Sequence, residues 1–163
     1  MTPSFQKIAR ISFLHLGLTL LALGCASSGP LNGVNAKGEK VYLGPVPIEN
    51  TQPYQEYLPT QHTEVDKQRF LFRRLKEATD LEFFQDGAWY NSIQAYRGGM
   101  WLMRERYQKG QDTRTFIKKY VDRSDAGQLH LARYPDGSTQ LGSAVLLNEL
   151  DLLEKTSEGN AKK

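Results

Sequence analysis

Cysteine is almost absent from this chain of 163 residues, because Cys25 is the only one. A single cysteine cannot form an intramolecular disulfide, so the folded part must be stabilised by its core. Histidine is also scarce, with three in the chain, and no two stand at the spacing of metal ligands. Neither a Ser-His-Asp triad nor a nucleophile elbow can be recognised. We therefore expect no cofactor and no metal, and an enzyme is the less favoured class.

The chain also lacks a predominant sign of charge. It has 21 lysines and arginines against 18 aspartates and glutamates. Two of the basic residues, Lys7 and Arg10, belong to an N-terminal segment that we expect to be removed, which leaves 19 basic against 18 acidic residues. Because the remaining protein is nearly neutral, no nucleic-acid partner is expected.

Long apolar runs are missing as well. The longest, residues 11–23, is shorter than the roughly 20 residues that cross a membrane, and His15 and Gly17 interrupt it. The run follows two basic residues and ends at Gly24 and Cys25. A basic start, a short apolar run and a small residue before the cleavage point are typical of a secretory signal peptide.

The cysteine at the end of this segment points to lipid attachment. The sequence LALGC at 21–25 resembles the bacterial lipobox, although Ala22 stands where the commonest form has leucine. The resemblance implies that residues 1–24 are cleaved and that Cys25 carries a diacylglyceryl group and an acyl chain, which anchor the protein to a membrane. Residues 26–28 contain no acidic residue, which in such lipoproteins implies the outer membrane, facing the periplasm. A plain signal peptide ending near a free cysteine is the alternative.

The segment that follows is interrupted by proline and glycine. Residues 25–62 hold five prolines and four glycines, which oppose helices and break strands. We interpret them as a lipidated N-terminus and a tether whose extended reach is on the order of 120 Å. Residues 54–58 are the part most expected to pack on the domain. A globular domain is predicted over 63–155, followed by a flexible tail at 156–163.

Helices are predicted from capping residues and apolar spacing. The first begins at Thr63, where Thr-Glu-Val-Asp forms a capping box, and runs to about Ala78. The other three begin at Asn91 or Ser92, at Asp112 or Thr113, and at Ser143. The second is expected to end near Lys109 and to bury Ile93, Tyr96, Met100, Met103 and Tyr107.

Two glycines interrupt the second predicted helix. Gly98 and Gly99 lie within its apolar face, and each costs roughly 1 kcal/mol of helix propensity. Close approach of another element explains their presence, and a bend in the helix is the alternative.

The strands complete the expected architecture. Apolar residues on both sides of Asp86 and Gly87 predict a hairpin over 81–90, and the run at 129–134 predicts a further strand. The fold class is therefore α+β. A small antiparallel sheet of about three strands is covered by three or four helices.

Residues 81–153, roughly half of the chain after Cys25, resemble a family of small bacterial envelope proteins, domain of unknown function 5329. The residues that carry this resemblance are Phe83, Asp86, Gly87, Tyr90, Ala95, Phe116, Ile117, Gly127 and the segment 148–150. They are turn, core and capping positions, so the resemblance implies a shared fold and compartment, not a reaction.

The departures from the family are also informative. Family members carry two cysteines at the positions of Leu81 and Tyr134, so the resemblance implies that these two residues lie beside each other on neighbouring strands. Members often have a histidine where this chain has Gly98.

A cluster of basic residues is the main candidate for binding. Its members are Arg104, Arg106, Lys109, Arg114, Lys118, Lys119 and Arg123. They would suit anionic lipid, lipopolysaccharide phosphate or peptidoglycan carboxylates. Solvated faces of two amphipathic helices are the alternative, and the favoured one.

Two other candidate sites are weaker. His130 is the only histidine within the predicted domain, and it is interpreted as a half-buried structural residue in preference to a general base. Four aromatic residues could line a groove, but core packing is favoured for them. They are Trp89, Tyr90, Tyr96 and Trp101.

The sequence thus predicts a lipid-anchored envelope protein that acts by binding or assembly. Its expected partners are the membrane, through lipid on Cys25, and an envelope protein, lipopolysaccharide or peptidoglycan. The alternative is a periplasmic enzyme acting on an envelope substrate and centred on His130.

Overall fold

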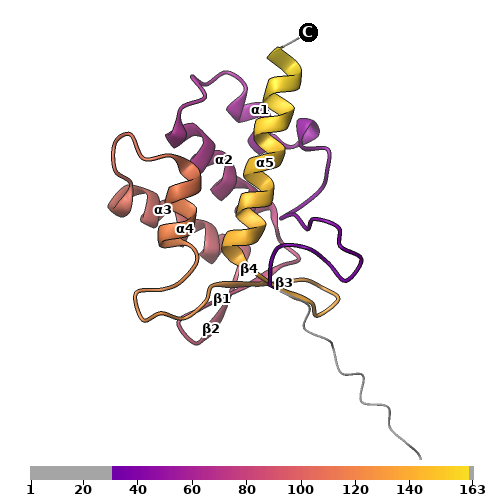
Figure 1. Cartoon of the computed structure of the whole chain (residues 1–163), viewed down its shortest axis with the longest axis vertical. Coiled ribbons are helices and arrows are strands. Elements are labelled where there is room, and N and C mark those ends of the chain that lie inside the picture. The colour runs from indigo at the N-terminus through magenta and orange to yellow at the C-terminus, as the bar shows by residue number, and fades with distance from the viewer. Residues whose placement is uncertain (1–30, 162–163) are drawn as a thin grey trace, which may run out of the picture.

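The computed structural model describes residues 31–161 and has an α+β fold (Figure 1). The helices are η1 (Ile48–Asn50), α1 (Gln52–Tyr57), α2 (Glu64–Glu77), α3 (Ser92–Arg106), α4 (Thr113–Tyr120) and α5 (Gly142–Ala161). The strands are β1 (Glu82–Gln85), β2 (Ala88–Asn91), β3 (Leu131–Arg133) and β4 (Thr139–Leu141). The sheet is antiparallel, in the order β2-β1-β3-β4, and lies at one end of the molecule, from which α5 rises to the C-terminus.

The predicted α+β class is confirmed, with one strand more than the three expected. The strand that sequence reasoning missed, β4, is only three residues long and is polar at Thr139 and Gln140. It forms a hairpin with β3 across the turn at 135–137, which was expected only to end a strand. Three residues are too few to show an alternating pattern.

Local sequence signals set the ends of the main helices. Thr63 caps α2 by a capping box, because its hydroxyl accepts from the Asp66 amide while the Asp66 carboxylate accepts from the Thr63 amide. Asn91 and Gln94 cap α3 in the same way, and Asp112 caps α4. The predicted starts of these helices are therefore confirmed.

The β1-β2 hairpin turns at the predicted dipeptide. Asp86 and Gly87 both have positive φ angles, +48° and +83°, as a two-residue hairpin turn requires. On its other side β1 pairs with β3, with Glu82 opposite Arg133. Leu81 and Tyr134 each lie one residue beyond this last pair, and the contact between them that the family resemblance implies stays a prediction.

The two glycines of α3 have different surroundings. A Cβ on Gly99 would lie 2.3 Å from Cδ1 of Phe72, so glycine at this position lets α2 and α3 approach closely, as expected. A Cβ on Gly98 would have no neighbouring atom within 4 Å. The predicted core face of α3 was wrong at Ile93, which is 38% exposed.

The segment expected to be a tether is largely part of the folded unit. Leu43, Ile48, Tyr54 and Tyr57 are buried in the same core as α2 and α5. Proline did not prevent a helix here, since Pro53 lies in the first turn of α1, where its missing N–H has no helical acceptor. The expected docking of residues 54–58 is present, but the predicted domain boundary at residue 63 has to be moved toward the N-terminus.

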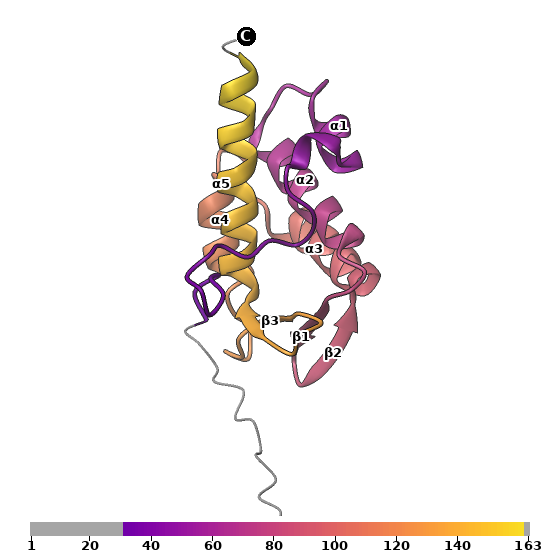
Figure 2. The ribbon, with the colours of Figure 1, turned by 90° about the vertical axis from the view of Figure 1, so that its right-hand side faces the viewer.

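Residues 33–47, which we call the strap, cross α5 in an irregular conformation (Figure 2). Buried side chains satisfy the backbone of the strap in place of a sheet. Asn148 Nδ2 donates to the carbonyls of Gly33 and Val41, at 2.7 and 3.0 Å. Gln140 accepts from the Gly33 amide at 3.0 Å and donates to the Val34 carbonyl at 2.8 Å.

A buried ion pair completes the attachment of the strap. Arg74 Nε lies 3.0 Å from Glu149 Oε2, and both side chains are fully buried. Glu149 also accepts from the Leu43 amide at 2.7 Å, and Arg74 donates to the Pro45 carbonyl at 3.2 Å. The segment 148–150, named above for its family resemblance, thus binds the strap.

The C-terminal end also differs from expectation. The predicted loose tail begins at residue 156, whereas α5 continues to Ala161. Cys25 and the predicted signal peptide at 1–24 lie outside the described residues.

Candidate ligand-binding cavity

A cavity of about 380 Å³ lies among α3, the β1-β2 hairpin, β3 and the start of α5. This volume is in the range of small-molecule sites, roughly 300 to 1,000 Å³. Its walls are mainly apolar, with Phe72 and Leu75 from α2, Phe83 and Phe84 from β1, and Val145 from α5. We call this space the apolar cavity.

The sequence of α3 helps to keep the apolar cavity open. Gly98 and Gly99 both line it, with Ala95 before them and Leu102 one turn later. Gly98 has no side chain, and no atom lies within 4 Å of the position that a Cβ would take. The helix α3 therefore fills little of the cavity at this point. The two glycines therefore have different roles. Gly99 allows the Phe72 ring to pack against α3, and Gly98 leaves space in the cavity.

A second cavity of about 470 Å³ adjoins the first at the C-terminal end of α3. Five residues line both cavities, namely Gln85, Asp86, Gly98, Leu102 and His130. The second cavity also has Arg106, Lys119 and Arg123 in its lining. We call it the basic cavity.

His130 lies where the two cavities meet. Its Nδ1 is 3.1 Å from the Val121 carbonyl, which only accepts, so Nδ1 carries the proton. Its Nε2 is buried and has no hydrogen-bond partner among the described residues. Burial lowers the pKa of His130 below its ordinary value, although the hydrogen bond to Val121 and the nearby Asp86 and Asp122 act in the opposite direction. The ring is therefore neutral at neutral pH, and Nε2 is an acceptor without a donor.

The predicted basic cluster divides into groups with different surroundings. Arg106, Lys119 and Arg123 come together around the basic cavity. Arg104 pairs with its neighbour Glu105 at 2.7 Å, while Lys109 and Lys118 are exposed and line neither cavity. The structure therefore does not bring the seven residues into one site.

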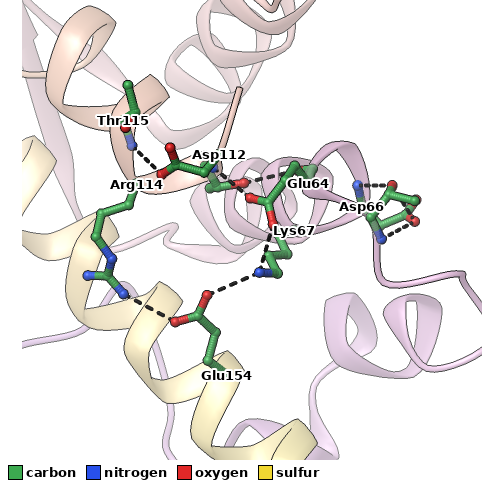
Figure 3. A network of polar contacts seen from close by, with 9 residues as sticks. Glu64, Asp66, Lys67, Asp112, Arg114, Thr115 and Glu154 are labelled. Atoms are coloured by element: carbon green, nitrogen blue, oxygen red, sulfur yellow. Dashed lines mark hydrogen bonds and ion pairs between the residues drawn. The ribbon is translucent and has the colours of Figure 1, made fainter. Parts of the chain in front are cut away.

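Arg114 belongs to an ion network that joins three helices (Figure 3). It donates to Glu154 at 3.1 Å and to Asp151 at 2.9 Å, both on α5. Lys67 of α2 bridges Glu154 and Glu64, at 3.1 and 2.9 Å. This network holds α2, α4 and α5 together, so Arg114 has a structural environment and not that of a binding residue.

Core packing was favoured for the four aromatic candidates, and it is wrong for both tryptophans. Trp101 is 47% exposed and lines the basic cavity, while Trp89 is 38% exposed and lies under the Arg133 guanidinium at 4.0 Å. Tyr90 lines the apolar cavity, and only Tyr96 packs against the core without lining either cavity. Helical spacing alone does not distinguish a buried face from a cavity wall.

Sequence reasoning also missed the apolar walls. Phe83 and Phe84 were recognised as hairpin residues but not as parts of a cavity. No sequence signal indicated the cavity, because Gly98 and His130 are distant in sequence and only the fold brings them to the same wall.

Within residues 31–161, no group of three or more histidine, cysteine, aspartate or glutamate side chains could hold a metal ion. No helix in that range is both long enough and apolar enough to span a membrane. Comparison of the chain with family models, with curated proteins and with solved structures finds no match in any of the three. The resemblance to the envelope family stays a prediction.

Proposed function

We propose that this protein is a lipid-anchored component of the bacterial envelope, facing the periplasm from the outer membrane, that binds a small ligand without transforming it. The observation that supports binding is the apolar cavity of about 380 Å³ beside the unpartnered Nε2 of His130. An apolar cavity with a few polar groups at one end is the usual form of a ligand site.

The anchor would hold the domain close to the lipid surface. Gly33 is bound through both its amide and its carbonyl, by Gln140 and Asn148. Only seven residues lie between Cys25 and Gly33, and the eight steps from one to the other span at most about 28 Å when fully extended. The effective tether is thus much shorter than the whole segment 25–62, and a ligand supplied by the membrane would be within a short distance of the cavity.

The anchor is tested by metabolic labelling with a palmitate analogue. Label is expected on the wild-type protein and not on Cys25→Ser. Labelling of Cys25→Ser to the wild-type extent would exclude Cys25 as the attachment site.

Binding is tested by filling the apolar cavity. Gly98→Leu adds a side chain where no atom lies within 4 Å, and Gly159→Leu makes the same change in α5, away from both cavities. Full-length proteins purified from membranes into amphipol are extracted with organic solvent, and the extracts are analysed by mass spectrometry. Wild type and Gly159→Leu are expected to release an apolar small molecule that Gly98→Leu does not retain. Equal retention by all three would refute binding in this cavity.

The unpartnered His130 Nε2 also favours a second candidate, an enzyme acting on an envelope substrate. The surroundings of His130 give this candidate less support, because its Nδ1 faces a carbonyl and not a carboxylate. Ser143, the hydroxyl on the first turn of α5, donates to Asp122 at 2.7 Å. Loss of envelope-substrate turnover in a folded His130→Ala protein would establish the enzyme, and unchanged turnover would exclude it.

A further inference from the structure

We infer that the ligand is an amphiphile with one apolar chain and an acidic head group. The chain occupies the apolar cavity, and the head group lies in the basic cavity between His130 and the cations Arg106, Lys119 and Arg123. This inference rests on the proposed function and names the chemical class of its ligand.

The linings of the two cavities differ, and this difference determines which part of the ligand each cavity can hold. In the apolar cavity, the side chains of Phe83, Leu102 and Val145 present only carbon atoms. The basic cavity lies directly beside it, because His130 and Gly98 line both. A ligand that fills both spaces must therefore be apolar at one end and polar at the other, and burial of its chain is favourable by roughly 0.8 kcal/mol per methylene.

The charged residues that line the cavities favour a negatively charged head group on the ligand. The linings of the two cavities contain four permanent cations, Arg97, Arg106, Lys119 and Arg123, against two carboxylates, Asp86 and Asp125. Asp125 is 93% exposed where it pairs with Arg106, so its charge is largely solvated. An acidic head group is the charge that this surplus attracts.

His130 also requires that the ligand place a hydrogen-bonding group at its Nε2 atom. Its Nδ1 is occupied by the Val121 carbonyl, so Nε2 is the atom left for the ligand. A carboxylic or phosphoric acid shares one proton with Nε2, either donating it from oxygen or receiving a hydrogen bond from the protonated ring. An ester has no such proton and leaves the buried Nε2 unpartnered, which costs binding free energy.

Photocrosslinking locates the chain of the ligand. Full-length protein in amphipol is irradiated with palmitic acid that carries a diazirine on its chain, and the crosslinked residues are mapped by mass spectrometry. Crosslinks are expected on the segments 83–102 and 142–146, which line the apolar cavity, in wild type and Gly159→Leu but not in Gly98→Leu. Crosslinks confined to other segments would overturn both this inference and the proposed function.

Competition with unlabelled amphiphiles tests the head group. Palmitic acid and palmitoyl lysophosphatidic acid are each expected to block crosslinking at concentrations about tenfold below that of methyl palmitate. The acid that acts at the lower concentration identifies the source, a free fatty acid or a lysophospholipid. If methyl palmitate competes as well as both acids, the acidic head group is excluded while binding in the cavity still stands.

A pair of adjacent lysines provides the matched control. Lys119 lines the basic cavity, whereas Lys118 is exposed and lines neither cavity. Lys119→Glu is expected to raise the concentration of palmitic acid needed for competition about tenfold, and Lys118→Glu to leave it unchanged. Methyl palmitate should compete equally in all these proteins. Equal effects of the two substitutions on the acid would overturn the placement of the head group.

Discussion

The two sides of this molecule differ in how deeply their ion pairs are buried and in how closely their side chains are packed. On the side of α5 and the strap, Arg74 and Glu149 form an ion pair whose side chains are both fully buried. Around the basic cavity, on the side of α3, the ion pair of Arg106 and Asp125 leaves the two side chains 42% and 93% exposed. The buried pair fixes one position of the chain, while the exposed pair is free to exchange its partners with water or ligand.

Packing follows the same division. The strap is bound by Asn148, Gln140 and Glu149, residues that are close together on β4 and α5 but more than 100 positions away from it in sequence. On the other side, Gly98 faces open space and Trp101 is exposed. Buried polar contacts are therefore concentrated on the strap side, while the α3 side keeps a cavity.

Removing the charge from the buried pair should have the largest effect. Glu149→Gln leaves the buried Arg74 guanidinium with only the partly solvated Glu77, 3.8 Å away, as a counter-ion, and we expect the free energy of unfolding to fall by about 3–5 kcal/mol. Urea denaturation of the purified variant measures this change.

The exposed pair of Glu82 and Arg133 provides the control. Glu82→Gln should change the free energy of unfolding by less than about 1 kcal/mol. If Glu149→Gln cost no more than Glu82→Gln, the strap side would not be the more stable one.

Overpacking the boundary between the two sides should have the next largest effect. Gly99→Ala places a Cβ against the Phe72 ring, with the nearest atom at 2.3 Å, so α2 and α3 must move apart. We expect a loss of about 1–3 kcal/mol of unfolding free energy, measured by thermal and urea denaturation. A stability equal to that of wild type would show that this helix contact is not close-packed.

Acid should weaken the network of Figure 3 with a smaller effect. Burial alone would raise the pKa of Glu64, but hydrogen bonds from Lys67 and Thr113 lower it below its ordinary value. A carboxylate with a lowered folded pKa stabilises the fold above its unfolded pKa, about 4.3, and this contribution is lost as pH falls through the folded pKa. The free energy of unfolding should therefore decrease below about pH 4.3, and less steeply in Glu64→Gln.

The size of this acid effect is about 1 kcal/mol, because Glu64 is partly solvated. Glu158→Gln, an exposed substitution near the end of α5, is the control and should keep the wild-type pH dependence. Identical pH profiles for wild type and Glu64→Gln would show that the network does not contribute.

Short-range signals explain which parts of the fold were predictable. Thr63 with Asp66, Asn91 with Gln94, and Asp86 with Gly87 each specify a helix start or a turn within four residues. The predictions based on them were confirmed, because caps and two-residue turns are local interactions.

The strap and the cavities were not predictable by the same reasoning. Between residues 33 and 47, proline and glycine oppose regular structure, and the interactions that bind this segment come from α2, β4 and α5. The cavities depend on how far α3 lies from the sheet, which no spacing of residues within α3 reveals. Gly98 and Gly99 look equivalent in sequence, and only the position of Phe72 distinguishes them.

The difference between Gly98 and Gly99 predicts the smallest change in the free energy of unfolding. It also predicts opposite signs for the same substitution at two adjacent residues. Gly98→Ala adds a methyl group where no atom lies within 4 Å and replaces a glycine inside a helix, so it should raise the free energy of unfolding by about 0.5–1 kcal/mol. The same substitution one residue later, at Gly99, is expected to destabilise. Parallel urea denaturation of the two variants measures both signs, and a shared sign would refute the division of α3 into a packed position and an open one. Because a methyl group removes little of the apolar cavity, Gly98→Ala should also retain the ligand that Gly98→Leu loses.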